Sequence, residues 1–148
     1  MEKAHKPKKV FVHGPISPDF VAKSIASHQS KTGIGAHAIF LGQIRADQKE
    51  GGAVTGIDYT AYEEMAEQAF HDIREAAFAK FELTCMHIYH SLGLVPTGEI
   101  SLFVFVSSPH RRAAFEASEY IVEEIKANVP IFGKELVGEG GHVWKENS

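Results

Sequence analysis

Three consecutive basic residues, His110, Arg111 and Arg112, lie in the stretch SSPHRRAAFEA, where an apolar strand-like run gives way to a helical pattern. The first turn of a helix carries unpaired backbone N–H groups, and guanidinium groups bind phosphate or carboxylate with two hydrogen bonds. These residues indicate either a site for an anionic ligand or a capped helix start with exposed arginines. Arg45, in GQIR at the end of another predicted strand, is a second candidate for anion binding.

Two lysines flank Pro130 in the stretch EEIKANVPIFGKE. Lys126 lies four residues after Val122, so it borders the apolar side of a predicted helix. A lysine partly withdrawn from water can transfer protons or act as a nucleophile, whereas one that extends its ammonium into solvent is a surface charge. Local spacing leaves both interpretations open for Lys126, and Lys134 follows in a strand-like segment.

Other reactive residues are interpreted as structural. Cys85 is the single cysteine and lies in an apolar strand, which favours buried packing over a nucleophile. His87 and His90 are separated by an odd number of positions on the same strand, so they face opposite sides and do not form a metal pair. Glycine-rich nucleotide-binding loops and common hydrolase motifs are absent from the sequence. We therefore expect no metal and no cofactor.

These candidates must be positioned by a small α+β fold. Helical spacing of apolar residues predicts three helices, at 18–30 after the cap Ser17, at 63–80, and at 110–128 before Pro130. The buried stripe of the last helix is predicted to contain Phe115, Ser118, Val122, Ile125 and Val129.

Strand-like segments separate these helices and predict the order βαββαββαβ. The segments 35–45 and 54–62, joined by a polar loop, are expected to form one antiparallel pair, and 83–93 with 99–108 another. A short strand at 131–137 and a closing aromatic segment HVW follow. The expected fold is thus an α+β domain with a largely antiparallel sheet.

Composition limits the classes of function. The length of 148 residues suits one domain, which we place at 10–148 after a charged tail at 1–9. A net charge of −4 argues against nucleic-acid binding. No apolar run reaches the ~20 residues that span a membrane, and the start lacks the apolar stretch of a secretory signal. With its single thiol, the chain is expected to be cytoplasmic.

Four segments, taken together, resemble one known family: GAHAIFLGQIR, DYTAYEEMA, SLFVFVSSPHRRAAFEA, and EEIKANVPIFGKE with GGHVW. In this order and spacing they are similar to the large, catalytic subunit of molybdopterin synthase, the MoaE family, over about residues 33–145. The resemblance implies an α/β hammerhead-type domain with a largely antiparallel sheet and three main helices.

The resemblance also implies an activity and partners. It implies a sulfurtransferase of molybdenum cofactor biosynthesis that forms a homodimer within a heterotetramer. A small ubiquitin-like subunit would bring sulfur as a C-terminal thiocarboxylate. Cyclic pyranopterin monophosphate would receive that sulfur in two successive transfers, which make the dithiolene of molybdopterin.

Site residues carried over from the resemblance agree with those singled out above. It implies that Lys126 is the principal catalytic lysine and Lys134 a less certain second one. The implied substrate-binding residues are Gln43, Ile44, Arg45, His110, Arg111, Gly133 and Glu135.

One position departs from the family pattern. The family commonly has two adjacent basic residues after the aromatic of its P-I-aromatic motif, whereas here Phe132 is followed by Gly133 and Lys134. Lys134 substitutes for the missing lysine if Gly133 adopts backbone angles that redirect the next side chain. Strand alternation argues against this, since neighbouring residues face opposite ways.

Helix length adds a constraint of its own. Arg111 and Lys126 are fifteen positions apart on one predicted helix, which is about 22 Å at 1.5 Å per residue. We therefore predict a composite pocket, in which Lys126 of one subunit meets His110 and Arg111 of the other. A non-catalytic scaffold that binds the small subunit or a phosphorylated pterin is the alternative, favoured by Gly133, and an unrelated anion-binding α+β enzyme is a third possibility.

Overall fold

The computed structural model describes residues 9–138 and 141–144, and the expected tail at 1–9 falls, except for Lys9, outside the described residues. The described elements follow the order βαβββαββαββ. Their bounds are β1 Phe11–His13, α1 Pro18–His28, β2 Ala36–Gln43, β3 Gln48–Lys49, β4 Gly52–Ala61, α2 Glu63–Lys80, β5 Cys85–Pro96, β6 Ile100–Ser108, α3 Arg111–Asn128, β7 Ile131–Val137 and β8 Gly141–Trp144. Among them, no helix combines the length and apolar character that a membrane span requires.

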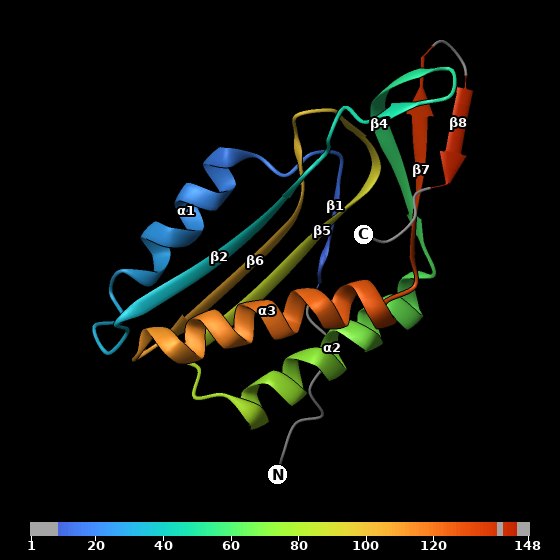
Figure 1. Ribbon diagram of the computed structural model, residues 1–148. Coiled ribbons are helices and arrows are strands. Elements are labelled where there is room, and N and C mark those ends of the chain that lie inside the picture. The colour runs from blue at the N-terminus through green and yellow to red at the C-terminus, as the bar shows by residue number, and fades with distance from the viewer. Residues whose placement is uncertain (1–8, 139–140, 145–148) are drawn as a thin grey trace.

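The strands form one eight-stranded sheet with the order β2-β6-β5-β4-β7-β8, to which β1 and β3 add at β5 and β4. All pairings are antiparallel except that of β1 with β5. The α+β fold with three helices and a largely antiparallel sheet is therefore confirmed. Figure 1 shows β4, β7 and β8 rising as a ribbon beyond the ends of the helices.

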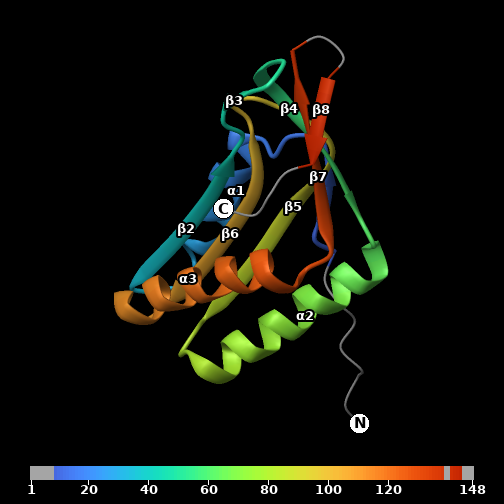
Figure 2. The same cartoon turned by 45° about the vertical axis from the view of Figure 1, so that its right-hand side comes forward.

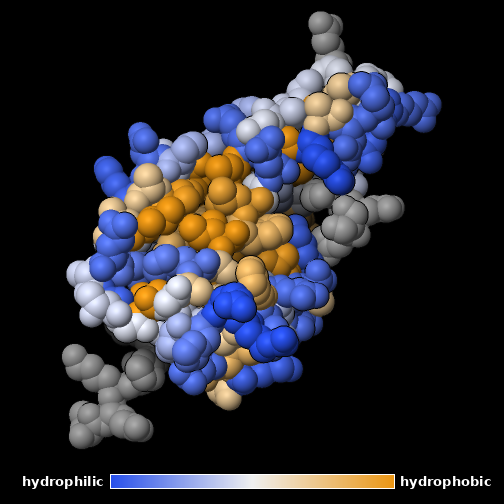
Figure 3. Space-filling model, turned by 60° about the vertical axis from the view of Figure 1, so that its left-hand side comes forward, coloured by the Kyte–Doolittle hydropathy of each residue, from blue (hydrophilic) through white to orange (hydrophobic). Residues whose placement is uncertain are grey.

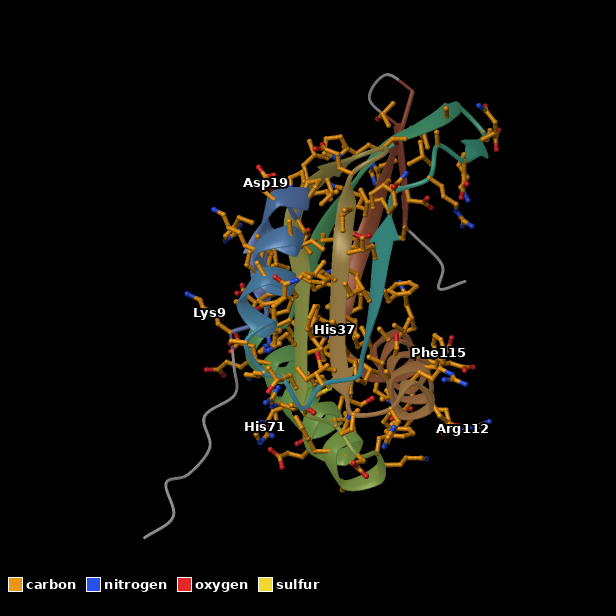
Figure 4. The ribbon with its side chains drawn as sticks, turned by 90° about the vertical axis from the view of Figure 1, so that its left-hand side faces the viewer. Lys9, Asp19, His37, His71, Arg112 and Phe115 are labelled. Atoms are coloured by element: carbon orange, nitrogen blue, oxygen red, sulfur yellow. The ribbon has the colours of Figure 1, made fainter. Side chains whose placement is uncertain are left out.

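The two faces of the sheet are covered by different helices, as the side-on view of Figure 4 shows. On one face, α2 and α3 pack on alternate residues of β5 and β6, including Met86, Ile88 and Val104. On the other face, α1 packs on Phe103 and Phe105. Because side chains alternate along a strand, successive residues of β5 reach different helices.

Local signals predicted the helices well. Ser17 caps α1 by accepting a hydrogen bond from the Asp19 N–H, at 3.1 Å, and Pro18 begins the helix as expected. α1 ends at His28, two residues before the predicted end, while α2 has the predicted bounds. Figure 2 shows α2 and α3 lying together against one face of the sheet.

Two expectations about packing were wrong. β2 pairs with β6, and β4 pairs with β5 and β7, so the predicted pair of 35–45 with 54–62 does not form. The turn there is instead a small hairpin of β3 with β4.

The buried stripe of α3 also differs from the prediction. It is formed by Ala114, Ala117, Ile121, Val122 and Ile125, whereas Phe115 is 66% exposed. Small alanines fit the close approach to the sheet, which a hydrophobicity pattern alone undervalues.

Candidate active site

Lys126 lies in the last turn of α3, where a positive charge interacts favourably with the helix dipole. Its side chain is half-buried and lines two neighbouring pockets. We call the first, of about 250 Å³, the β2 pocket, and the second, of about 340 Å³, the β7 pocket. Tyr59, His90 and Lys126 line both, so these three side chains mark the boundary between them.

The β2 pocket brings together residues that are far apart in the sequence. Its lining includes four of the predicted substrate-binding residues, which are Gln43, Ile44, Arg45 and Glu135. Arg45 is exposed and its guanidinium lies 3.4 Å from the Asp47 carboxylate. An exposed ion pair of this kind contributes little to stability, so the guanidinium can turn to an anionic ligand at small cost.

The β7 pocket is more apolar. It is lined by Ile125, Val129, Ile131 and Phe132 around the end of α3, with Gly133 on β7 and Trp144 on β8. Tyr59 lies directly opposite Gly133 in the β4–β7 ladder. Gly133 therefore lines the pocket together with Tyr59 and Lys126 and contributes no side chain to it.

His90 is a site residue that the sequence interpretation missed. It is buried, and its Nδ1 donates to the Ser91 carbonyl oxygen at 2.7 Å, which leaves Nε2 as the acceptor nitrogen of the neutral ring. Burial, with a smaller effect of the Lys126 charge, lowers its pKa from 6.5 to about 4. His90 is thus neutral near pH 7, and the odd separation from His87 had already indicated that the two face opposite sides.

Tyr59 stands against the His90 ring, with ring centroids 5.0 Å apart in an edge-on arrangement. Its hydroxyl lies 3.3 Å from Ser101 Oγ. Burial raises the pKa of Tyr59, and the nearby Glu135 charge adds to this effect. The side chain therefore remains a neutral phenol that can donate a hydrogen bond at the pocket boundary.

Alternation along β7 separates Lys134 from this site. Gly133 lines the β7 pocket and Glu135 lines the β2 pocket. Lys134, between them in the sequence, is not among the described residues that line either pocket. The φ angle of Gly133 is not positive, so this glycine does not adopt the unusual backbone conformation that would turn the Lys134 side chain into the site. The catalytic role of Lys134 stays a prediction, without support from this geometry.

A lysine from another strand approaches the site instead. Nζ of Lys49, on β3, lies 3.9 Å from Oε1 of Glu135, whose side chain is only 7% exposed. The polar loop that holds Lys49 had no sequence signal for a site residue. Its position depends on the β3–β4 hairpin, which folds back toward β7.

His110 and Arg111 lie at the other end of α3. His110 is the N-cap residue in an extended conformation, and Ser108 Oγ donates to its carbonyl oxygen. With Arg112, Phe115 and Glu116 they line a separate open pocket of about 500 Å³, the α3-start pocket. Figure 4 shows Arg112 and Phe115 projecting outward from α3. Within one chain, the structure does not bring His110 and Arg111 to Lys126.

Comparison with known proteins identifies related sequences. Residues 12–128 match the profile of the family described as MoaE protein. The chain is 38% identical over 122 residues to a molybdopterin synthase catalytic subunit from Pyrococcus abyssi, covering 82% of each chain. It is 41% identical to the catalytic subunit from Aspergillus fumigatus, covering 81% of this chain and 63% of that relative. The chain therefore spans somewhat less than two thirds of the length of that fungal relative.

Solved structures share the fold. Molybdopterin synthase from Staphylococcus aureus superimposes with a TM-score of 0.79 at 31% identity, covering 96% of this chain and 99% of that chain. A complex of subunits 1 and 2 of the molybdopterin-converting factor from Helicobacter pylori gives a TM-score of 0.78 at 21% identity, covering 93% and 89%. The second likeness concerns the fold alone.

Proposed function

The chain belongs to the MoaE protein family, and on this premise we propose that it is the catalytic subunit of a molybdopterin synthase. In this proposal it is a sulfurtransferase, which moves sulfur from the C-terminal thiocarboxylate of a small ubiquitin-like subunit to cyclic pyranopterin monophosphate. The observation that carries the proposal is the position of Lys126 at the boundary of two pockets. One pocket is then available to each reactant.

The chemistry of the two linings assigns the reactants. The β2 pocket, with the Arg45 guanidinium at its edge, suits the phosphate and polar ring of the pterin. The β7 pocket, with its apolar walls and the space beside Gly133, suits an extended peptide that ends in two glycines. The thiocarboxylate would then meet the pterin side chain at Lys126.

Lys126 has a defined task in this arrangement. Its ammonium group offsets the negative charges of the thiocarboxylate and of the phosphate, which otherwise repel each other. It also lies where a proton must move as a sulfur–carbon bond forms. The neutral His90 ring can accept a hydrogen bond at Nε2, and the Tyr59 phenol is a hydrogen-bond donor on the same boundary.

The α3-start pocket enters the proposal through a second copy of the chain. When two copies pack about a two-fold axis with their α3 helices antiparallel, the start of each helix lies beside the end of the other. His110 and Arg111 of one copy would then complete the anion site around Lys126 of the other. A homodimer that binds two small subunits is the heterotetramer proposed here.

An apolar surface supports an assembly of this kind. Ile39, Phe40 and Leu41 on the edge strand β2 are exposed, and a groove of about 470 Å³ lies between β2 and α3 beside Phe115. Figure 3 shows a broad hydrophobic area on this side of the molecule. Contiguous exposed apolar side chains of this kind often mark a protein interface. A cytoplasmic location, where a lone thiol stays reduced, is part of the same proposal.

A non-catalytic scaffold is the second candidate, because glycine occupies the position at which the family pattern has a lysine. A scaffold would bind the same ligands without turnover. Reconstitution separates the two: the purified chain is mixed with a thiocarboxylated small subunit and cyclic pyranopterin monophosphate, and molybdopterin is measured.

The enzyme proposal predicts product from the unsubstituted chain. Lys126→Ala is expected to lower the rate by about 10²- to 10⁴-fold, the range for loss of a proton-transferring group. Lys23→Ala, an exposed lysine on α1, is the control and should keep the unsubstituted rate. Lys134→Ala tests the second lysine: because Lys134 lies outside the lining of both pockets, we expect a rate within a few-fold of the unsubstituted one. Tight binding of the small subunit with no product would instead favour the scaffold.

A further inference from the structure

A second group of reactive side chains lies on the face of the sheet opposite Lys126. His28 is the last residue of α1, and Cys85 and His87 lie two positions apart on β5, so both face α1. One ligand atom from each of these three residues lies within 4.8 Å of the other two. The two imidazole Nε2 atoms are 3.0 Å apart.

The hydrogen bonds of His28 orient it as a metal ligand. Its Nδ1 lies 2.7 Å from the Ser24 carbonyl oxygen, which can only accept, so Nδ1 carries the hydrogen. In the neutral ring Nε2 then presents a lone pair toward His87. Metal-binding histidines in proteins are commonly held in this way, with the second nitrogen donating to a carbonyl oxygen.

The sulfur of Cys85 also acts as an acceptor. Nζ of Lys31 donates to Sγ at 3.0 Å. Lys31 is exposed, so its ammonium can turn into solvent when another cation takes its place at the sulfur. The cluster therefore already holds a positive charge at the atom that would bind a metal as thiolate.

Packing holds the three side chains close together. His28 and Cys85 are buried, and His87 is half-buried. The ring of Phe105 on β6 packs against His28 and His87, with centroid distances of 4.8 and 6.2 Å. Phe105 thus forms an apolar wall on one side of the cluster, and His87 is the member that is partly exposed to solvent.

We propose that His28, Cys85 and His87 bind one divalent transition-metal ion of the Zn²⁺ type. One thiolate and two imidazoles are ligands that suit Zn²⁺, with bonds of about 2.0 to 2.3 Å. A tetrahedral ion would set the two nitrogens about 3.3 Å apart and each nitrogen about 3.5 Å from the sulfur. The two rings, now 3.0 Å apart, would therefore separate slightly, and the ligand atoms, now within 4.8 Å of one another, would draw together around the ion. A water molecule would take the fourth position, and the ion would fasten the end of α1 to β5.

The test uses Co²⁺ as a spectroscopic substitute for Zn²⁺, with the full chain stripped of metal under reducing conditions. We expect one Co²⁺ per chain and a thiolate-to-cobalt charge-transfer band, which Zn²⁺ abolishes by competition. Cys85→Ser should remove the band, and His87→Gln should weaken binding at least about 10-fold, since losing only a hydrogen-bonding partner of a metal ligand already has an effect of that size. His37→Gln is the matched control, because His37 also packs on Phe105, at 5.1 Å, yet is not in the cluster.

The inference is overturned if the unsubstituted chain gives no charge-transfer band, or if His87→Gln binds as tightly as His37→Gln. In that case the two histidines form only their hydrogen-bonded pair, and Cys85 is a buried thiol that accepts a hydrogen bond from Lys31. Should Cys85→Ser fail to fold by circular dichroism, the half-buried His87→Gln decides the question. A rise in the unfolding temperature with Zn²⁺, lost in His87→Gln, is a second readout that does not depend on sulfur transfer.

Discussion

At the scale of single residues, the surroundings of Lys126 are as informative as the lysine itself. Its neighbours His90 and Tyr59 are both held neutral by burial, the first with a lowered pKa and the second with a raised one. A cationic ligand-binding group beside two neutral hydrogen-bonding groups suits anionic reactants. Glu135 is the buried carboxylate in the described lining of the β2 pocket, and it pairs with the ammonium group of Lys49.

Burial of neutral His90 makes stability depend on pH. Its pKa is about 4 in the folded chain and 6.5 in the unfolded chain, so between these values the unfolded chain takes up a proton that the folded chain does not. The contribution of His90 to the free energy of unfolding is therefore largest above pH 6.5. It decreases by about 3 kcal/mol as the pH falls from 6.5 to 4. Urea unfolding at several pH values measures the effect.

His90→Gln is the comparison for that prediction. It removes this titrating group, so its free energy of unfolding should vary less between pH 6.5 and 4 than that of the unsubstituted chain. Equal pH dependence in the two proteins would show that His90 does not carry the effect.

The contact of Lys49 with Glu135 predicts an effect on substrate binding. Lys49→Ala removes this positive charge and leaves a more negative pocket for an anionic substrate. We expect KM for cyclic pyranopterin monophosphate to rise roughly 10-fold, or about 1.4 kcal/mol, with a smaller change in kcat. Lys49→Arg should restore most of the affinity, and Lys23→Ala, an exposed lysine on α1, is the control. An unchanged KM in Lys49→Ala would rule out this electrostatic contribution.

At the scale of elements, α3 connects the two basic regions of the molecule. It is an unbroken helix from Arg111 to Asn128, so its basic start and Lys126 cannot meet within one chain. The backbone continues through Pro130 into β7, which brings Gly133 and Glu135 back to the pockets beside the end of the same helix.

Mixed dimers test whether a second α3 completes the site. Arg111→Ala and Lys126→Ala chains should each be nearly inactive alone. Unfolded together and refolded, they form mixed dimers in about half of the molecules, each with one intact composite site, so about a quarter of the full activity should return. No recovery, with mixed dimers present by mass spectrometry, would contradict a site shared between subunits.

At the scale of the whole molecule, the sheet separates two chemistries. The face covered by α3 holds the Lys126 pockets, and the face covered by α1 holds His28, Cys85 and His87. The strand β2 forms one edge of this sheet, and its side chains are partly exposed: Ile39 is 37% exposed and Leu41 is 41% exposed. An unpaired apolar edge is a ready surface for association.

Disruption of this edge should separate the proposed dimer. Ile39→Glu places a charge at an apolar contact but lies outside the lining of the two Lys126 pockets. We expect the dimer dissociation constant to rise on the order of 10²-fold, because a buried unpaired charge is costly. Light scattering over a range of concentrations measures the mass. The control is Ala26→Glu on the exposed side of α1, and a full dimer in Ile39→Glu would place the interface elsewhere.

Sequence by itself determined the features that depend on near neighbours along the chain. Ser17 and Pro18 predicted where α1 begins, and periodicity predicted both long helices, because caps and helical spacing act within one or two turns. Motif spacing pointed to Lys126, Arg45 and Glu135, which the fold brings to one region.

Tertiary structure alone decided which distant segments meet. β2 pairs with β6, although its predicted partner follows directly in the sequence, because strand pairing is decided by burial of whole faces and is not a local property. The packing of distant elements likewise decides that His90 lies beside Lys126, that Lys49 approaches Glu135, and that His28 meets Cys85 and His87. No pattern in one segment carries that information, since each contact joins residues from different elements.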